Sequence, residues 1–250
     1  ILFVCAGAAM NLLLGFVILS VLVSMRTSLP TTIIYELRSP QAAASELRVG
    51  DEVISVNGHR VFTSNDISFS IVSDKDGIID FVVIRDGRKV SVPGVNLGMT
   101  IMEDGTRVVD PGFVVDITPK TFWGSARYAV LWMFSIIRQV WLSFINLITG
   151  NFTLAELSGP VGVSTVIGQA STAGLKTLLL LVGFITVNIG VFNLLPIPAL
   201  DGGRLLFLLI ELVIRRPVNQ KYESVIHAAG FILLMGLMLV VTFNDILRFF

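Results

Sequence analysis

The residues with the clearest chemical potential lie in one short stretch, NLLPIPALDGGRLLF, at positions 193–207. It places a single carboxylate, Asp201, between two prolines and two glycines, directly after an apolar run that begins at Leu175. Pro196 and Pro198 lack backbone donors and force the residues before them out of helical geometry. Unsatisfied backbone in lipid is costly, so such a break is tolerated only inside protein or beside a wet cavity. The stretch therefore predicts a polar site at the edge of a membrane.

Two interpretations of this stretch are open on the motif alone. In the first it is an ordinary helix boundary, where Asn193 caps one helix, Asp201 caps the next, and Gly202 and Gly203 form the turn. In the second, Asp201 is an intramembrane ionisable group, which is a functional residue by default. The elements around the stretch must decide between them.

The composition indicates that much of the chain lies in lipid. Hydrophobic residues make up 54% of the 250 residues and charged residues 14%, whereas a soluble domain has about 25% charged residues. The net charge is zero and gives no indication of a nucleic-acid partner. The single cysteine, Cys5, excludes a disulfide within the chain and a cysteine metal site.

Long apolar runs predict three membrane spans. Residues 1–25 carry no charge, and at about 1.5 Å per residue they cross a hydrocarbon core of about 30 Å. Residues 175–195 form a second span, and residues 227–241 the core of a third. Residues 122–149 are also long enough, but their tryptophans and two arginines fit a helix that lies in the interface. We favour the interfacial position for that helix.

Between the first span and the interfacial helix, alternating runs bounded by Asn-Gly and Asp-Gly pairs predict a small strand-rich domain over residues 30–118. Within it, SPQAAASELRVGDEVISVNGHRV (39–61) resembles the central segment of PDZ domains, with a core at about 30–97. That resemblance rests on Pro40, Ala42, Ala43, Leu47, Gly50, Asp51, Ile54, Asn57 and Gly58. A PDZ domain binds a peptide by adding a strand to its sheet edge. A spacer without a ligand fits the same pattern.

Loop charges set the expected orientation. Arg204, Arg215, Arg216 and Lys221 lie between the last two spans, which assigns that loop to the cytoplasm. With an interfacial helix at 122–149, the PDZ-like domain lies outside the cytoplasm. If that helix spans instead, the domain lies inside.

With these elements in place, VNIGVFNLLPIPALDGGRLLF resembles the signature of the site-2 protease family of intramembrane zinc metalloproteases, an asparagine followed by Pro-x-Pro and then Leu-Asp-Gly. SGPVG, the ending TFNDILRFF and the inserted PDZ-like domain also match the bacterial members. The resemblance covers nearly the whole chain and implies a membrane protein, an α-helical transmembrane bundle with an inserted α+β PDZ-like domain. The implied location is the bacterial inner membrane, with several passes and the PDZ-like domain extracytoplasmic.

The resemblance divides the chain into four parts. Residues 1–25 are the family's second core helix, and residues 30–118 are the PDZ-like domain. Residues 119–172 form an interfacial amphipathic helix and a connector. Residues 173–250 are the C-terminal transmembrane helices with the motif.

The resemblance also implies roles for the motif residues. Asp201 becomes the third ligand of a catalytic Zn²⁺ held by two histidines, with a glutamate as general base. Asn193 holds the extended substrate backbone, and the segment broken by Pro196 and Pro198 keeps the site open. The implied substrates are single-span membrane proteins such as anti-sigma factors or signal-peptide remnants. The residues expected to shape the surroundings are Gly202, Gly203 and Asn188.

The chain departs from the family pattern because it has no His-Glu-x-x-His sequence. Its two histidines are too few and too far apart for the i, i+4 geometry, so we expect His59 at the surface and His227 at the membrane interface. Since the chain begins at the family's second core helix, we interpret it as the C-terminal portion of a longer protease, inactive alone. The alternative is a non-catalytic membrane scaffold that presents a PDZ domain. A transporter ranks lower, because only one helix is broken.

Overall fold

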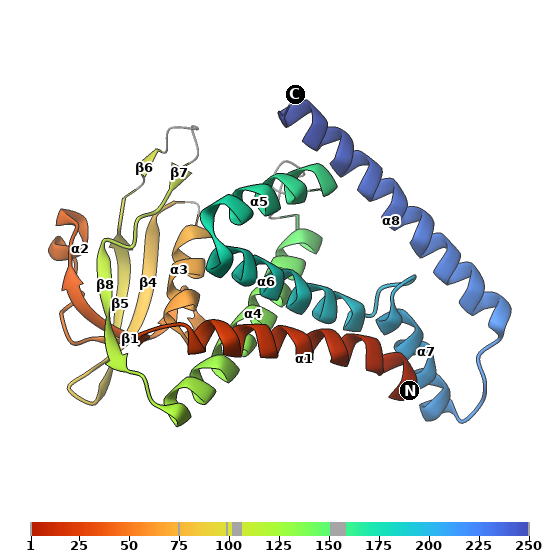
Figure 1. Ribbon diagram of the computed structural model, residues 1–250, viewed down its shortest axis with the longest axis horizontal. Helices are drawn as coiled ribbons and strands as arrows, with labels where there is room; N and C mark the ends of the chain where they lie inside the picture. The colour runs from red at the N-terminus through yellow and green to blue at the C-terminus, as the bar shows by residue number, and fades with distance from the viewer. Residues whose placement is uncertain (1, 75, 99, 102–106, 151–158, 250) are drawn as a thin grey trace. The chain divides into compact units, whose positions relative to one another are not determined.

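The computed structural model describes residues 2–74, 76–98, 100–101, 107–150 and 159–249 (Figure 1). The chain forms two compact units, Val23–Ser135 on the one hand and Ile1–Leu22 with Ile136–Phe250 on the other. The first unit is rich in strands and the second is helical. Helix α4 (Phe122–Ile148) contributes residues to both.

The strand-rich unit is built on a six-stranded sheet of strand order β5-β4-β2-β1-β8, with β3 paired to β2. All of these pairs are antiparallel. Its strands are β1 (Ser28–Leu37), β2 (Glu52–Val56), β3 (His59–Arg60), β4 (Ile78–Arg85), β5 (Arg88–Asn96) and β8 (Phe113–Pro119), and β6 (Thr100–Ile101) pairs with β7 (Arg107–Val108) in a second sheet. The alternating runs therefore do form the strands of a β-sheet, as predicted.

Two short helices, α2 (Pro40–Ala44) and α3 (Ser64–Val72), pack on this sheet. Ala42 of α2 is fully buried in the same hydrophobic core as Val53 of β2. Asn57 and Gly58 both have positive φ, which the tight turn between β2 and β3 requires. The short alanine-rich helix and the turns that suggested a PDZ domain are thus present, and the PDZ identity itself stays a proposal.

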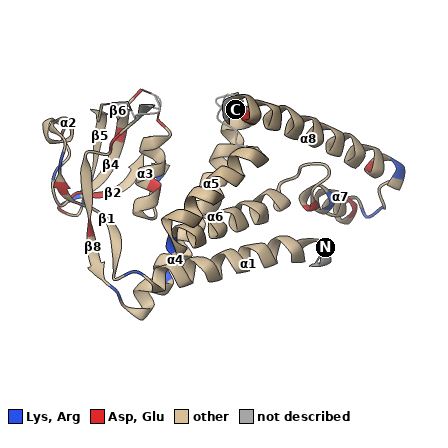
Figure 2. Cartoon of the chain, turned by 45° about the horizontal axis from the view of Figure 1, so that its top comes forward, with Lys and Arg blue, Asp and Glu red and all other residues tan. Residues whose placement is uncertain are grey.

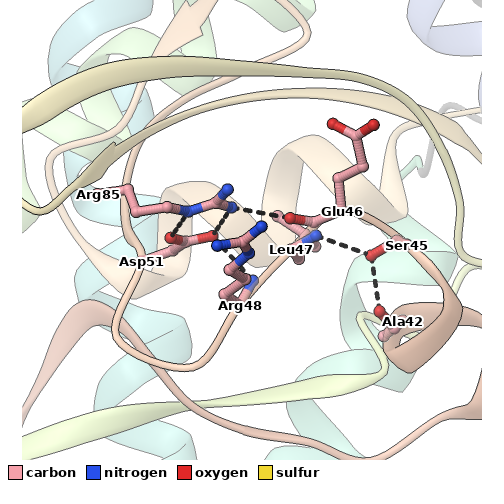
Figure 3. Close-up of polar contacts among 7 residues, drawn as sticks. All are labelled: Ala42, Ser45, Glu46, Leu47, Arg48, Asp51 and Arg85. Carbon is pink, nitrogen blue, oxygen red and sulfur yellow. Dashed lines mark hydrogen bonds and ion pairs between the residues drawn. The ribbon is translucent and has the colours of Figure 1, made fainter.

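A buried ion pair fixes the Gly-Asp turn before β2 (Figure 3). The Asp51 carboxylate accepts from Nε and a terminal nitrogen of Arg85 at 2.8 and 2.7 Å, and from the Arg48 N–H at 2.9 Å. The same Arg85 donates to the Glu46 carbonyl at 2.8 Å. Burial by itself raises the pKa of Asp51, but the bonds from Arg85 and Arg48 outweigh it and lower the pKa below its usual value.

The helical unit contains the apolar runs. Besides α4 its helices are α1 (Leu2–Ser24), α5 (Pro160–Ala173), α6 (Leu175–Leu194), α7 (Asp201–Ile214) and α8 (Gln220–Phe249). Among the described residues, four helices are long and apolar enough to cross a membrane: α1, α4, α6 and α8. In Figure 2, α1 is without charge, and the charged residues around α7 and α8 gather near the helix ends. These helices make the chain a membrane protein of the α-helical kind, and the interfacial position of α4 stays a prediction.

Glycines bring α1 and α6 into close contact. A Cβ on Gly15 would lie 2.4 Å from the Val187 side chain, and a Cβ on Gly190 would lie 2.9 Å from the Leu12 side chain. Such distances leave no room for a methyl group, so the two backbones approach as small residues allow in lipid. This contact ties the first span to the helix that leads into the proline-broken stretch.

Helix α5 lies inside the region that the sequence predicts as a connector, whose residues 151–158 are outside the described part. Its composition is unusual for a helix, but Pro160 occupies the first turn, where a missing N–H costs nothing. The buried Asp245 carboxylate of α8 accepts from the Gly162 N–H at 2.8 Å. A carboxylate from a distant helix therefore caps α5, a contact that no local pattern reveals.

Candidate metal-ligand site

The site is built where α6 breaks. Leu195, in extended geometry, ends the helix before Pro196 and donates its N–H to the Phe192 carbonyl at 3.0 Å. The Leu200 N–H then bonds to the Ile197 carbonyl at 3.2 Å, closing a tight turn over Pro198. The two prolines thus do what the sequence predicts, since the chain leaves the helix and turns before α7 begins.

Asp201 is the first residue of α7, and the residue in the N-cap position is Leu200. The interpretation of Asp201 as a helix cap is therefore wrong. Its exposed side chain has no hydrogen bond or ion pair with any described residue. A Cβ on Gly7 of α1 would lie 3.6 Å from Asp201 Oδ2, so the first span passes directly beside the carboxylate, as the neighbouring ends of α1 and α7 in Figure 1 show.

The two glycines after Asp201 let α7 approach the broken segment. A Cβ on Gly202 would lie 2.1 Å from the Leu195 carbonyl oxygen, and a Cβ on Gly203 would lie 2.5 Å from the Ile197 carbonyl oxygen. Both glycines are buried. Only glycine fits at these positions, because any larger residue would push the start of α7 and its carboxylate away from the turn.

The two asparagines lie on the other side of the break, on α6. Asn188 and Asn193 both line an apolar cavity of about 450 Å³ between α5 and α6. Both are half-buried, and their side-chain amides have no hydrogen-bond partner among the described residues. The remaining lining residues are Val163, Val166, Leu181, Phe184, Ile185, Ile189 and Phe192. The structure thus places free amide groups in an apolar hollow next to the broken segment.

His227 of α8 contacts the turn, which the sequence did not reveal. Its Nδ1 accepts a hydrogen bond from the Ala199 N–H at 3.0 Å, and its ring lies 5.7 Å from that of Phe207. The expectation of a simple interfacial residue therefore missed its partner. His59, in contrast, is exposed on β3, as predicted.

A zinc ion needs more ligands than the described residues bring together. No group of three or more His, Cys, Asp or Glu side chains lies close enough among them to hold a metal. The free, exposed carboxylate of Asp201 fits a zinc ligand in its chemistry, but as one member of a set. His227 uses Nδ1 for the turn, and His59 belongs to the other unit.

Comparison with known proteins decides the family. The model of peptidase family M50 matches residues 1–237. The chain belongs to family M50, the site-2 proteases. It is 36% identical over 250 residues to the zinc metalloprotease RasP of Geobacillus kaustophilus, and 32% identical over 250 residues to the regulator of sigma-W protease RasP of Bacillus subtilis. Each match covers 99% of this chain and 58% of the relative.

A third relative shows nearly the same coverage. The zinc metalloprotease RasP of Shouchella clausii is 33% identical over 248 residues, which is 98% of this chain and 58% of that protein. This chain thus spans a little over half the length of these relatives. Two of them are named zinc metalloproteases and the Bacillus subtilis relative is named a protease. The M50 match includes the Pro-x-Pro and Leu-Asp-Gly stretch.

Proposed function

We propose that this chain is the C-terminal portion of an intramembrane zinc metalloprotease, in which it supplies one metal ligand and the substrate-binding segment. One observation carries the proposal: in a family M50 chain, a proline-broken segment holds the Asp201 carboxylate exposed and without a partner among the described residues. The start of α7 favours the charged form of this carboxylate, whose free oxygens are then available to a metal ion.

Asp201 would provide a hard oxygen ligand of Zn²⁺. Bound zinc would polarise the peptide carbonyl and make water acidic enough to attack it at neutral pH. Gly202 and Gly203 hold the carboxylate close to the turn, and Gly7 of α1 leaves space beside it. The two histidine ligands and the general base would come from a His-Glu-x-x-His helix beyond these 250 residues, so the portion alone would be inactive.

The substrate would be an extended segment of a single-span membrane protein, such as an anti-sigma factor or a signal-peptide remnant. A helical substrate keeps its carbonyls in its own hydrogen bonds, so cleavage requires local unwinding. The free amide of Asn193, at the end of α6, can bond to the peptide groups that unwinding exposes. Asn188 adds a second amide in the same cavity, whose apolar lining suits the side chains of a membrane segment. The stretch around Pro196 and Pro198 lacks two backbone donors and keeps this end of α6 open.

The strand-rich unit would be a PDZ domain on the extracytoplasmic face of the bacterial inner membrane. Its main sheet ends at β5 and β8, whose outer edges could each add a peptide strand. The domain would then select substrates by binding their trimmed ends or by excluding large extracytoplasmic parts.

The test is cleavage of a single-span reporter by the intact protein in lipid vesicles. We expect cleavage that a zinc chelator stops and added zinc restores, and we expect Asn193→Leu to raise KM because it removes the free amide. Thr186→Val, on the same helix but away from the cavity lining, is the matched control. An intact, folded protein that contains no zinc and leaves every reporter uncut would refute the proposal and favour the scaffold.

A further inference from the structure

The turn before Asp201 holds an unusual backbone conformation. Ala199 has a φ of 77°, in the left-handed region that residues other than glycine seldom adopt. With Pro198 in second place, Ala199 in third and the Leu200 N–H bonded to the Ile197 carbonyl, the segment has the pattern of a type II turn. Type II turns usually have glycine in third place. Another group must therefore favour this conformation over the commoner type I turn.

His227 is placed to do so. Its Nδ1 accepts from the Ala199 N–H at 3.0 Å, across 28 residues of sequence. The two turn types differ by a flip of the Pro198–Ala199 peptide, which exchanges the directions of its N–H and C=O. In the flipped state a carbonyl oxygen would face the Nδ1 lone pair, so the hydrogen bond would be lost unless the ring proton moved from Nε2 to Nδ1.

The position of His227 is fixed by close packing. A Cβ on Gly230, one turn further along α8, would lie 2.4 Å from Pro198 Cβ and 2.8 Å from the Pro198 carbonyl oxygen. The Phe207 ring lies against the imidazole. Because Nδ1 accepts, the ring proton is on Nε2, which is buried without a partner among the described residues. The imidazole therefore meets the turn through one atom, Nδ1.

We propose that His227 is a positioning residue for the reaction: it selects the left-handed turn and so sets the direction of the Asp201 carboxylate two residues later. The proposal rests on the proposed role of Asp201 as a metal ligand. His227 neither holds the metal nor touches the substrate. It acts through the Ala199 peptide, and its loss would misdirect the ligand without removing it.

Three substitutions in the intact protein distinguish the roles of the two imidazole nitrogens, Nδ1 and Nε2. His227→Asn places a carbonyl oxygen near the position of Nδ1, and His227→Gln places its polar group near that of Nε2. His227→Phe keeps a ring against Phe207 and removes both nitrogens. His59→Phe, the same change at the exposed histidine of β3, is the matched control.

The readouts are amide hydrogen exchange of residues 195–203, which requires neither metal nor activity, and the cleavage kinetics of a single-span reporter. For His227→Phe we expect exchange about tenfold faster and kcat about tenfold lower with KM unchanged, since the half-buried Ala199 N–H loses its acceptor. His227→Asn should stay within about threefold of the unsubstituted protein in both readouts, as expected for a retained hydrogen bond. His227→Gln should resemble His227→Phe.

Two results would overturn the proposal. The first is unchanged hydrogen exchange and kcat in His227→Phe. The second is slow exchange retained in His227→Gln but lost in His227→Asn, which would assign the role to Nε2. A fall in kcat together with a large rise in KM would also contradict it, because it would place His227 against the substrate. If the unsubstituted protein is folded but neither binds zinc nor cleaves, the proposed function fails. The exchange data then decide separately whether His227 holds the turn.

Discussion

Substitution of Gly202 by alanine tests how closely the start of α7 must approach the broken helix. A Cβ at this position would lie 2.1 Å from the Leu195 carbonyl oxygen and 2.6 Å from the Leu194 carbonyl carbon, where ordinary contact begins at 3.4 Å. Both neighbours are backbone atoms at the C-terminal end of α6, so they have little freedom to move. The start of α7, and Asp201 with it, must therefore move by about 1 Å, a misplacement that can lower a catalytic rate by about a hundredfold.

The assay is cleavage of a single-span reporter by the intact protein in lipid vesicles, together with thermal unfolding in detergent. We expect Gly202→Ala to lose about a hundredfold in kcat and about 1–3 kcal/mol of stability from overpacking. Gly236→Ala on α8 is the control, because a Cβ there meets no described atom within 4 Å, and alanine favours a helix by up to about 1 kcal/mol. A folded Gly202→Ala protein that cleaves within about threefold of the unsubstituted rate would refute the inference from the close approach.

Substitutions at Asp51 and Asp245, each with a control, test two contacts away from the motif. Asp51→Ala should cost about 3 kcal/mol of unfolding free energy by leaving Arg85 unpaired, whereas Glu36→Ala, which breaks the exposed pair with Arg38, should cost less than about 1 kcal/mol. Because the folded pKa of Asp51 is lowered, its contribution is complete above the unfolded pKa of about 4 and is lost as the pH falls through the folded value; equal acid sensitivity of the Asp51→Ala and unsubstituted proteins in thermal melts would contradict this. Asp245→Ala should cost about 1–2 kcal/mol by uncapping α5 while Asp245→Asn, which keeps an oxygen acceptor, should cost less; equal losses in thermal melts would show that the cap does not depend on that oxygen.

The sequence was sufficient wherever a local property decides the structure. In lipid the backbone N–H and C=O groups of a long apolar run must bond to one another, so the length of the apolar run predicts α1 and α6. The prolines break α6 by removing backbone donors, whatever surrounds them. The Asn57–Gly58 pair fixes a tight turn because its residues tolerate positive φ.

The sequence was insufficient wherever the hydrogen-bond partner of a residue lies far away along the chain. The composition of α5 suggests a connector, and its cap is the Asp245 carboxylate 83 residues from Gly162. His227 has no local signature for its bond to Ala199, because a histidine near a helix end is common at membrane interfaces. Whether Asp201 caps a helix or stands free could not be decided from residue types, since both fit. The structure decides it through the N-cap at Leu200.

The most direct test of the account is the zinc content of the intact protein, purified at one fixed free zinc concentration, with Asp201→Asn compared with Glu223→Gln. Both changes remove one carboxylate and keep the side-chain size, but Glu223 lies in the first turn of α8 and is not part of the broken segment. The account predicts about one zinc per molecule in the unsubstituted and Glu223→Gln proteins and a marked loss in Asp201→Asn. Equal zinc in all three proteins would contradict the assignment of Asp201 as a metal ligand.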